Sequence, residues 1–540
     1  MELMLERAES LIWGWPLLIL ILASGAYLTV RLRFLTLRRL PEAMRLLFRR
    51  GPAKGGVTPF GAFCTAMSAT IGTGNLVGVA TALALGGPGA LFWMELSAVT
   101  GMAVKYAEGL LAIKYRFRDP DGSHRGGPFA YILLGLGSRW KPLAASFALF
   151  GALAGLCGAG TFVQIGSFTA CLRAWLQSCG VREPELAAFG RSIPILPLGL
   201  GLVLAAAAGV LILGGIGRIS RASAVLVPLM GGGYLLCCLF ILLARLPALP
   251  EVLKRVMLGA FRPDAAFGGL LGAVQAGVSR GVFSNEAGLG TAPIAAAAAE
   301  GTTPAEQGLI SMTASVFDTL VICTLTGLVI LLAGTWQGGV TAVMDAFAAT
   351  LPLPGVLSRG IVALCLGLFS FTTVVSWSYY AVSCLDHLTG SRPAFRKPYL
   401  AFYVATAAVA PCFSVRSVWM AANIFNGLMA VPNLIGVLLL TGPVLLDSRD
   451  IMVARSRNGR RAHGDPLQRR PGAGLREAGG RGIRRRSGRP AGASASAAGR
   501  SRRQSSHGPP ARPGRRRADG PGEDGQSGLR SVRADPRRLV

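Results

Sequence analysis

The fold is decided by two glycine-interrupted apolar stretches, TAMSATIGTGNLVGVATA at residues 65–82 and GVSRGVFSNEAGLGTAPIAA at residues 277–296. Each glycine inside a helix costs about 1 kcal/mol relative to alanine. Backbone that leaves the helix at membrane depth is tolerated only where it is buried in protein or lines a cavity. The two stretches therefore predict two helices that unwind around a polar cavity, the first near Gly72–Gly74 and the second within residues 277–296.

The composition is that of a membrane protein. Of the 540 residues, 51% are hydrophobic and 15% are charged, whereas soluble domains carry about 25% charged residues. Apolar runs long enough to cross a bilayer recur along the chain. They predict eleven membrane spans, near residues 10–30, 58–86, 90–114, 142–176, 193–215, 222–245, 267–299, 307–334, 356–386, 398–412 and 415–446.

Ten of these spans divide into two sets of five, and the first span is left over. The sets cover residues 58–246 and 267–446, and each begins with one of the interrupted stretches. Because an odd number of spans gives the two sets opposite orientations, they form the inverted repeat of many secondary transporters. The sequence thus predicts an all-α membrane protein of 11 transmembrane helices, with a five-plus-five inverted repeat, two broken helices and one extra N-terminal helix. That helix and a basic connector occupy residues 1–57, and residues 247–266 form an extracytoplasmic linker.

The net charge of +29 is concentrated in two places. One is residues 31–54, which carry eight Lys or Arg residues, as cytoplasmic segments of membrane proteins do. We therefore expect a multi-pass protein of the cell membrane, with its N-terminus outside and its C-terminus in the cytoplasm. Four basic residues in the loop 245–262 oppose this orientation. Charge that orients spans needs no nucleic-acid partner, so we expect membrane lipid and no nucleic acid.

The other place is the segment 447–540. Residues 451–540 hold 23 Arg, no Lys, 16 Gly and 8 Pro, and have a net charge of +17. Such a segment buries too little apolar surface to offset the entropy of ordering, so we interpret it as a disordered Arg/Gly/Pro-rich cytoplasmic tail. Two origins stay open: a basic tail that touches anionic lipid, and a read-through or shifted frame in a GC-rich gene.

The first interrupted stretch supplies backbone groups suited to ions. If the helix opens at Gly72–Gly74, the carbonyls before the break lose their helical partners and become ligands for a hard cation such as Na⁺. The amides after the break can receive a carboxylate, and Asn75 adds a side-chain oxygen. In a later span, the hydroxyls of Thr372 and Thr373 and the carbonyl of Phe369 can complete an oxygen site. The alternatives are glycines that only let helices pack closely and threonines bonded to their own helix.

Five further side chains are candidates for the site. Gln164 lies in mid-span, where a polar group serves either helix packing or substrate contact. Asp318 is a functional or pairing residue, because a charge at the membrane midplane costs at least about 2.5 kcal/mol. Arg280 and Glu286 flank the second break and can pair across it, either as a gate or only to neutralise each other. Trp377 lies one turn beyond the threonine pair and can cap a small cavity.

The remaining polar residues give no sign of an enzyme. Glu95, Lys105 and Glu108 are expected near the ends of their span, where long side chains reach water. The four histidines lie in loops or in the tail. The chain has no GxxxxGK[ST] phosphate loop and no HExxH motif, and the spans hold no recognisable nucleophile–base pair. We therefore expect no catalytic activity.

Five strings closely resemble the alanine or glycine:cation symporter family. The resemblance implies a LeuT-like fold, which is a five-plus-five inverted repeat, and sodium-coupled, or in some members proton-coupled, uptake of alanine or glycine. The strings are ATIGTGNLVGVATALALGGPGALFWM (69–94), GMAVKYAEGLLAIKYR (101–116), RGVFSNEAGLGTAPIAAAAA (280–299), DTLVICTLTGLVIL (318–331) and FTTVVSWSYY (371–380).

The resemblance also assigns roles to residues. It places Na⁺ at the carbonyls of Ser68, Ile71 and Phe369 and the hydroxyls of Thr372 and Thr373. It places the amino acid at Thr73, Gly74 and Asn75, with walls formed by Gln164, Trp377 and the second break, which it locates around Gly281–Phe283. The chain departs from the family pattern at residues 126–132 and 381–382, which affects the substrate and the cytoplasmic gating but not the class.

These assignments imply a small neutral amino acid and Na⁺ or H⁺ as the transported partners, with no other cofactor. Two other functions stay open. One is a proton-coupled symporter of small amino acids. The other is a cation channel, which would conduct ions without an amino acid.

Overall fold

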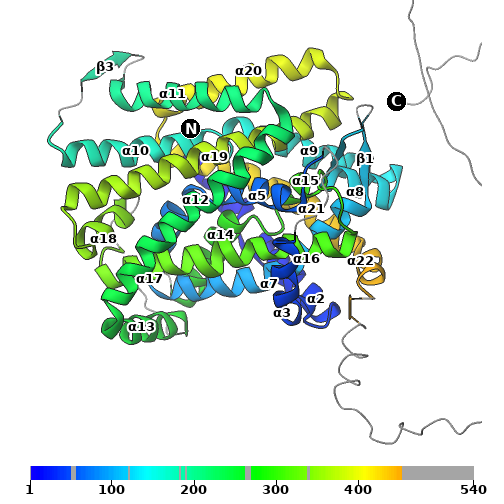
Figure 1. Cartoon of the computed structure of the whole chain (residues 1–540), viewed down its shortest axis with the longest axis horizontal. Coiled ribbons are helices and arrows are strands. Elements are labelled where there is room, and N and C mark those ends of the chain that lie inside the picture. The colour runs from blue at the N-terminus through cyan, green and yellow to red at the C-terminus, as the bar shows by residue number, and fades with distance from the viewer. Residues whose placement is uncertain are drawn as a thin grey trace, which may run out of the picture. The chain divides into compact units, whose positions relative to one another are not determined.

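The computed structural model is almost entirely helical (Figure 1). The structure describes residues 2–49, 56–119, 122–181, 184–188, 191–261, 269–336, 341–449 and 451–452. The chain divides into two compact units, Met1–Gly464 and Asp465–Val540, and the described residues all lie in the first. The predictions for the tail beyond residue 452 therefore fall outside the described residues.

The elements of the first predicted repeat and of the segment before it are short helices followed by longer ones. In chain order they are α1 (Glu2–Ile12), α2 (Trp15–Arg31), α3 (Leu35–Arg38), α4 (Leu40–Leu47), α5 (Pro59–Thr70), η1 (Gly74–Gly78), α6 (Val79–Gly86), α7 (Gly89–Lys114), β1 (Arg116–Arg118), β2 (His124–Gly126), α8 (Pro128–Leu136), η2 (Ser138–Trp140), α9 (Lys141–Cys157), α10 (Phe162–Ser178), β3 (Glu185–Ala188), β4 (Arg191–Pro194), α11 (Ile195–Ile212) and α12 (Gly215–Ala244). The strands form two antiparallel hairpins, β1–β2 and β3–β4.

All the regular elements in the rest of the described chain are helices. Its elements are η3 (Leu246–Ala248), α13 (Leu249–Phe261), α14 (Gly269–Asn285), α15 (Ala292–Ala296), α16 (Pro304–Ser315), η5 (Val316–Cys323), α17 (Thr324–Ala333), α18 (Ala342–Thr350), α19 (Gly355–Thr389), α20 (Pro393–Val409), η7 (Ala410–Cys412), α21 (Val415–Leu439) and α22 (Thr441–Asp447). Two of the elements, η1 and η5, are π-helical.

Within the described residues, seven helices are long and apolar enough to cross a membrane, and one bent pair, α5 with η1 and α6, is an eighth candidate. The other three predicted spans correspond to α11, to α14 with α15, and to α20. The total of eleven therefore stays a prediction. The seven helices are Glu2–Arg31, Gly89–Lys114, Ser138–Ser178, Gly215–Ala244, Pro304–Ala333, Gly355–Thr389 and Val415–Leu439.

The first broken helix opens where the glycines predict. Thr58 caps α5 by accepting a hydrogen bond from the amide of Gly61. After Thr70 the backbone becomes extended at Ile71, and the chain bends by 52° before it continues as η1 and α6. The break predicted near Gly72–Gly74 is thus present.

The second broken helix opens later than predicted. The helix α14 continues through Gly281 and Phe283 to Asn285, so the break expected at Gly281–Phe283 is wrong. The unwound segment follows, with positive φ angles at Glu286 (55°), Gly288 (86°) and Gly290 (79°). The earlier glycine serves close packing, because a Cβ atom on Gly281 would lie 2.7 Å from Ser97 Oγ in α7.

The two broken helices lie against each other in opposite directions. The helix α5 packs against α15, whereas α6 packs against α14. The helix α7 lies along α14 and α16, α9 and α10 pack on α19, and α11 packs on α20 at one edge (Figure 1). The first unwound segment contacts α10 and α19 through Gln164 and Thr373, and the second contacts α9 and α21 through Phe147 and Asn433.

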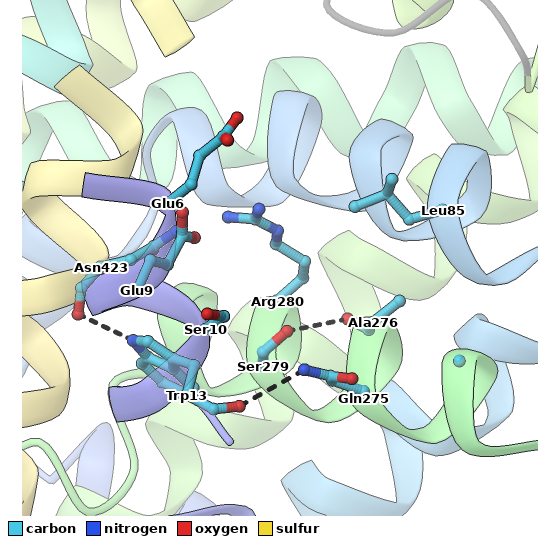
Figure 2. A pocket seen from close by; sticks show the side chains of 11 residues that line it. Glu6, Glu9, Ser10, Trp13, Leu85, Gln275, Ala276, Ser279, Arg280 and Asn423 are labelled. Atoms are coloured by element: carbon cyan, nitrogen blue, oxygen red, sulfur yellow. Dashed lines mark hydrogen bonds between the residues drawn. The ribbon is translucent and has the colours of Figure 1, made fainter. Parts of the chain in front are cut away.

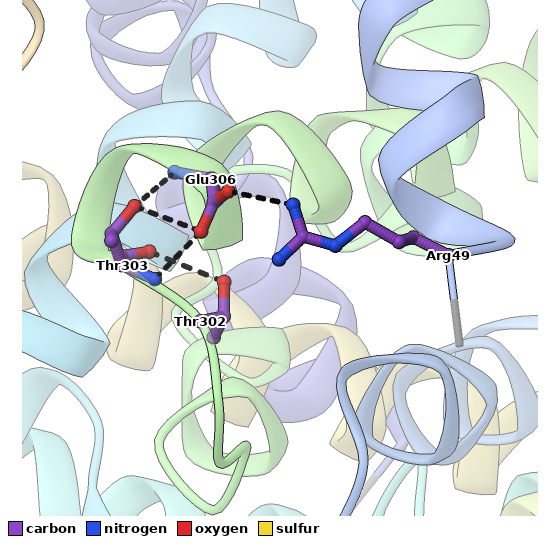
Figure 3. Close-up of polar contacts among 4 residues, drawn as sticks. All are labelled: Arg49, Thr302, Thr303 and Glu306. Atoms are coloured by element: carbon purple, nitrogen blue, oxygen red, sulfur yellow. Dashed lines mark hydrogen bonds and ion pairs between the residues drawn. The ribbon is translucent and has the colours of Figure 1, made fainter. Parts of the chain in front are cut away.

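The basic connector is tied to the second set of helices. Thr303 and Glu306 form a capping box at the start of α16, in which Glu306 Oε2 accepts from the amide of Thr303 at 3.0 Å. Arg49, just after α4, donates to Glu306 Oε1 at 3.3 Å (Figure 3). Because α4 also packs on α16, this end of the connector is fixed to the helix bundle.

Candidate functional site

Four of the five predicted sodium ligands meet at one point. The hydroxyl Oγ1 of Thr373 lies 3.0 Å from the carbonyl oxygen of Ser68 and 3.2 Å from that of Ile71, where α5 ends. It lies 2.9 Å from the carbonyl oxygen of Phe369 in its own helix. All four residues are buried. A hydroxyl has one proton, so it can donate to only one of these three carbonyls at a time.

Thr372 is directed elsewhere. Its hydroxyl donates to the carbonyl of Phe369 at 3.0 Å and lies 3.4 Å from the sulfur of Met230 in α12. Its only link to the other predicted ligands in the described residues is therefore the carbonyl of Phe369.

The amides of the first break are held by side chains. The amide of Gly72 donates to Asn75 Oδ1 at 2.9 Å, and the amide of Thr73 donates to Gln164 Oε1 at 3.2 Å. A Cβ atom on Gly72 would lie 2.9 Å from both Gln164 Oε1 and Thr373 Oγ1, so a larger residue would collide with both. The buried hydroxyl of Thr73 has no hydrogen-bond partner among the described residues. It is available to a ligand.

Asp318 connects the two broken helices. It lies in the π-helical element η5, a type of helix that occurs frequently at functional sites. Its carboxylate accepts from Asn75 Nδ2 at 2.6 Å, from Ser284 Oγ at 2.9 Å and from Thr319 Oγ1 at 2.8 Å. Three donors satisfy the buried charge, as a carboxylate at this depth requires. Sequence reasoning missed Ser284, although SNE within an apolar stretch was a visible signal.

Glu286 does not pair with Arg280, and the predicted ion pair across the second break is wrong. Glu286 instead accepts from Trp377 Nε1 at 3.2 Å and from Thr291 Oγ1 at 2.6 Å. The guanidinium carbon of Arg280 lies 5.3 Å from the ring centroid of Trp419. Because α14 stays helical to Asn285, Arg280 and Glu286 are separated by more than one and a half turns and lie on different faces.

The predicted substrate residues gather in part. Gly74 touches α14, because a Cβ atom there would lie 3.4 Å from the ring of Phe283. Gly281 faces α7, away from this point. Thr73, Asn75, Gln164 and Trp377 are each at most 3% exposed. The site is therefore closed on all sides in this conformation.

Lys105 and Glu108 lie deeper than expected. They are 0% and 1% exposed, so their expected location near water is wrong. Glu108 Oε1 accepts from Asn433 Nδ2 at 2.6 Å, whereas the ammonium of Lys105 has no hydrogen-bond partner in the described part of the chain. The span containing them is long and almost wholly buried in protein, which its sequence did not indicate.

Cavities approach the broken helices from both ends. Near α6 and α14, two hollows of about 360 and 510 Å³ share Glu6, Glu9, Leu85 and Arg280, and Figure 2 shows the residues that line the first of them. Near the start of α5, a hollow of about 470 Å³ is lined by residues that include Thr58, His124 and Glu300. The closed site thus lies between hollows at both ends of the broken helices.

Backbone contacts tie the α5 and α15 end together. Val57 and Ala299 form a parallel bridge, and the amide of Glu300 donates to Val57 O at 2.9 Å. Arg116 Nη1 donates to the carbonyls of Ala297 and Ala299 at 2.8 and 2.7 Å. Burial and the charge of Arg116 lower the pKa of His124, so its 3.8 Å contact with Glu300 involves a neutral imidazole near pH 7.

A helical membrane protein with two interrupted helices, and with a closed polar site between hollows at both ends, has the architecture of a membrane transporter. The chain belongs to the sodium:alanine symporter family, whose model matches residues 1–463. It is accordingly a sodium-coupled amino-acid symporter and not an enzyme.

Named relatives cover most of the chain. The sodium/alanine symporter AgcS of Methanococcus maripaludis is 41% identical over 463 residues, covering 83% of this chain and 96% of that protein. The probable sodium/glutamine symporter GlnT of Bacillus subtilis is 37% identical, covering 82% and 89%. The putative sodium/proton-dependent alanine carrier protein YrbD of the same organism is 36% identical, covering 82% and 90%.

Proposed function

We propose that the protein takes up alanine or glycine together with Na⁺ by alternating access. The observation that carries this proposal is the convergence of Thr373 with the carbonyls of Ser68, Ile71 and Phe369. The hydroxyl of Thr373 can donate to only one of the three carbonyls at a time, whereas a cation can bind all four oxygens at once. Na⁺ binds these four oxygens, and Thr372 supports the cluster by donating to the carbonyl of Phe369.

The substrate site is proposed to lie at the first break. The hydroxyl of Thr73, which lacks a partner within the described residues, donates to the carboxylate of the amino acid. The amide oxygen of Gln164 accepts from its ammonium group. The near-complete burial of these residues favours alanine or glycine over a longer substrate such as the glutamine named for GlnT.

The proposed architecture is the LeuT-like inverted repeat. If the two sets of helices are related by a pseudo-two-fold axis, corresponding helices contact each other in antiparallel pairs. The contacts of α5 with α15 and α6 with α14, and those of α7 with α16 and α11 with α20, have this pattern. Rocking of one set against the other then opens the closed site to one side at a time.

One sodium ion supplies enough energy for strong accumulation. A tenfold Na⁺ gradient is worth about 1.4 kcal/mol, and 100 mV adds about 2.3 kcal/mol per charge. Together they concentrate the amino acid several-hundred-fold at most.

The test is uptake of labelled alanine into proteoliposomes with an inward Na⁺ gradient, with unlabelled glycine and glutamine as competitors. We expect Na⁺ to stimulate uptake and glycine to compete much better than glutamine. Stimulation by an inward proton gradient without Na⁺ would favour the proton-coupled alternative instead. Equal competition by glutamine would contradict the proposed substrate size.

A further inference from the structure

A polar vestibule lies outside the buried site, between the N-terminal helix α1, α6, α14 and α21. It comprises the two hollows that share Glu6, Glu9, Leu85 and Arg280, and it is lined on one side by Trp419. Its volumes, about 360 and 510 Å³, are within the roughly 300–1,000 Å³ of ligand pockets. Figure 2 shows α1 contributing Glu6 and Glu9 opposite the side chain of Arg280.

Arg280 has unused hydrogen-bonding capacity in this vestibule. Its guanidinium lies over the ring of Trp419 at 5.3 Å, and no hydrogen bond or ion pair reaches it from the described residues. Glu9 is the carboxylate that acts on it electrostatically. A guanidinium presents five donors in a planar fork that matches a carboxylate. All five are available to a ligand.

The two carboxylates that line the vestibule already have partners. Glu6 is bound by Arg416 at the rim, where Arg416 is 72% exposed. Glu9 receives a hydrogen bond from Asn423 Nδ2, which holds its carboxylate at the wall that faces Arg280 (Figure 2). The vestibule therefore offers a free cation on one side and a positioned anion on the other, which is the charge pattern complementary to a zwitterion.

The aromatic pair Phe283–Trp419 lies between the vestibule and the first break. Phe283 packs on Trp419 with ring centroids 4.7 Å apart. The other side of Phe283 lies next to Gly74. Trp419 is fixed in place by its Nε1, which donates to Ser167 Oγ at 3.1 Å. A molecule in the vestibule would thus be one aromatic layer away from the buried site.

We propose that this vestibule is a second amino-acid site, in which a zwitterion places its carboxylate on Arg280 and its ammonium toward Glu9 before the Phe283–Trp419 pair opens. This inference rests on the proposed function, because it takes the occupant to be the transported amino acid. It gives the extra N-terminal helix a direct role, since α1 supplies the anion of the site.

A binding experiment distinguishes the vestibule from the buried site. Equilibrium binding of labelled alanine is measured on the full-length protein in lipid nanodiscs, in Na⁺ and in choline. The vestibule contains none of the proposed sodium ligands, so it binds alanine weakly in choline, whereas the buried site adds a component that requires Na⁺. Arg280→Gln is expected to reduce the choline component at least about tenfold. Glu9→Gln is expected to reduce it by a smaller factor.

Arg416→Gln is the matched control. It removes the same charge from the vestibule rim without touching Arg280, and the choline component should remain. Equal choline binding by wild type and Arg280→Gln would overturn the vestibule site. So would displacement of alanine by chloride or propionate as readily as by glycine, because that result describes a simple anion site.

The outcomes for the two proposals are distinct. If the wild-type protein shows no Na⁺-dependent alanine binding, the proposed sodium coupling is wrong. Binding in choline still tests the vestibule site by itself. Gel filtration of Arg280→Gln confirms that it folds. Trp419→Phe, which keeps the ring against Phe283, should retain the choline component at a reduced affinity.

Discussion

At the level of single residues, the oxygen cluster depends on Thr373 more than on its neighbour Thr372. Adjacent residues of a helix point about 100° apart, so only one member of the doublet can face α5. The hydroxyl of Thr373 reaches the carbonyls of Ser68 and Ile71, whereas that of Thr372 reaches Met230. In sequence the two hydroxyls are equivalent, and only the packing of α19 on α5 separates their roles.

Thr373→Val should therefore impair Na⁺ binding more than Thr372→Val does. Loss of the central oxygen is expected to raise the Na⁺ concentration for half-maximal alanine uptake at least tenfold, which corresponds to about 1.4 kcal/mol. Thr372→Val should shift it by a smaller factor. Sodium titrations of uptake in proteoliposomes measure both, and equal shifts in the two variants would be evidence against the assigned geometry.

Gly72 is expected to tolerate no side chain. In Gly72→Ala, the new methyl group would displace both Gln164 and Thr373, because a Cβ atom lies 2.9 Å from each. Alanine uptake should fall at least tenfold while the protein still inserts and folds. The control is Gly78→Ala in η1, where a Cβ atom meets nothing within 4 Å. If the two variants transport equally well, the crowding at Gly72 has no functional consequence.

At the level of elements, the first broken helix could be predicted from its sequence and the second could not be located. In both stretches glycines interrupt an apolar run, but a glycine that lets α14 approach α7 looks the same as one that unwinds a helix. The positive φ at Glu286 is rare for a non-glycine residue. Its cause is tertiary: Trp377 and Thr291 hold the carboxylate.

Arg116 of β1 holds the segment that follows α15, and this contact can be weakened. Arg116→Gln loses charge-assisted hydrogen bonds to the carbonyls of Ala297 and Ala299, each worth about 1.5–3 kcal/mol. Hydrogen exchange at the amide of Glu300, which is bonded to Val57, should accelerate at least about tenfold.

The control for this experiment is Arg118→Gln. It removes the same charge from the same strand, β1, but Arg118 is exposed and makes no contact with α15 among the described residues. If hydrogen exchange at Glu300 is unchanged by Arg116→Gln, or is equally accelerated by both variants, Arg116 does not hold the segment after α15 in place.

At the level of the whole molecule, the class could be predicted from hydropathy, glycine interruptions and Lys/Arg distribution. The family match confirms a sodium-coupled amino-acid symporter. The depth of charged residues could not be predicted, as Lys105 shows. A charged residue buried among other helices and one near the end of a span, with its charge in water, give the same sequence pattern. The partner of Arg280 was mistaken for a related reason: it depends on where α1 folds back, and the sequence does not encode that contact locally.

The central claim is that Na⁺ and the amino acid cross together, and reverse coupling tests it most directly. Proteoliposomes receive an inward alanine gradient with equal Na⁺ on both sides, and entry of radioactive sodium is followed. Alanine should drive sodium entry in wild type, and the double variant Thr372→Ala with Thr373→Ala should abolish this entry. Sodium entry that proceeds at the same rate without alanine would contradict symport and indicate a channel.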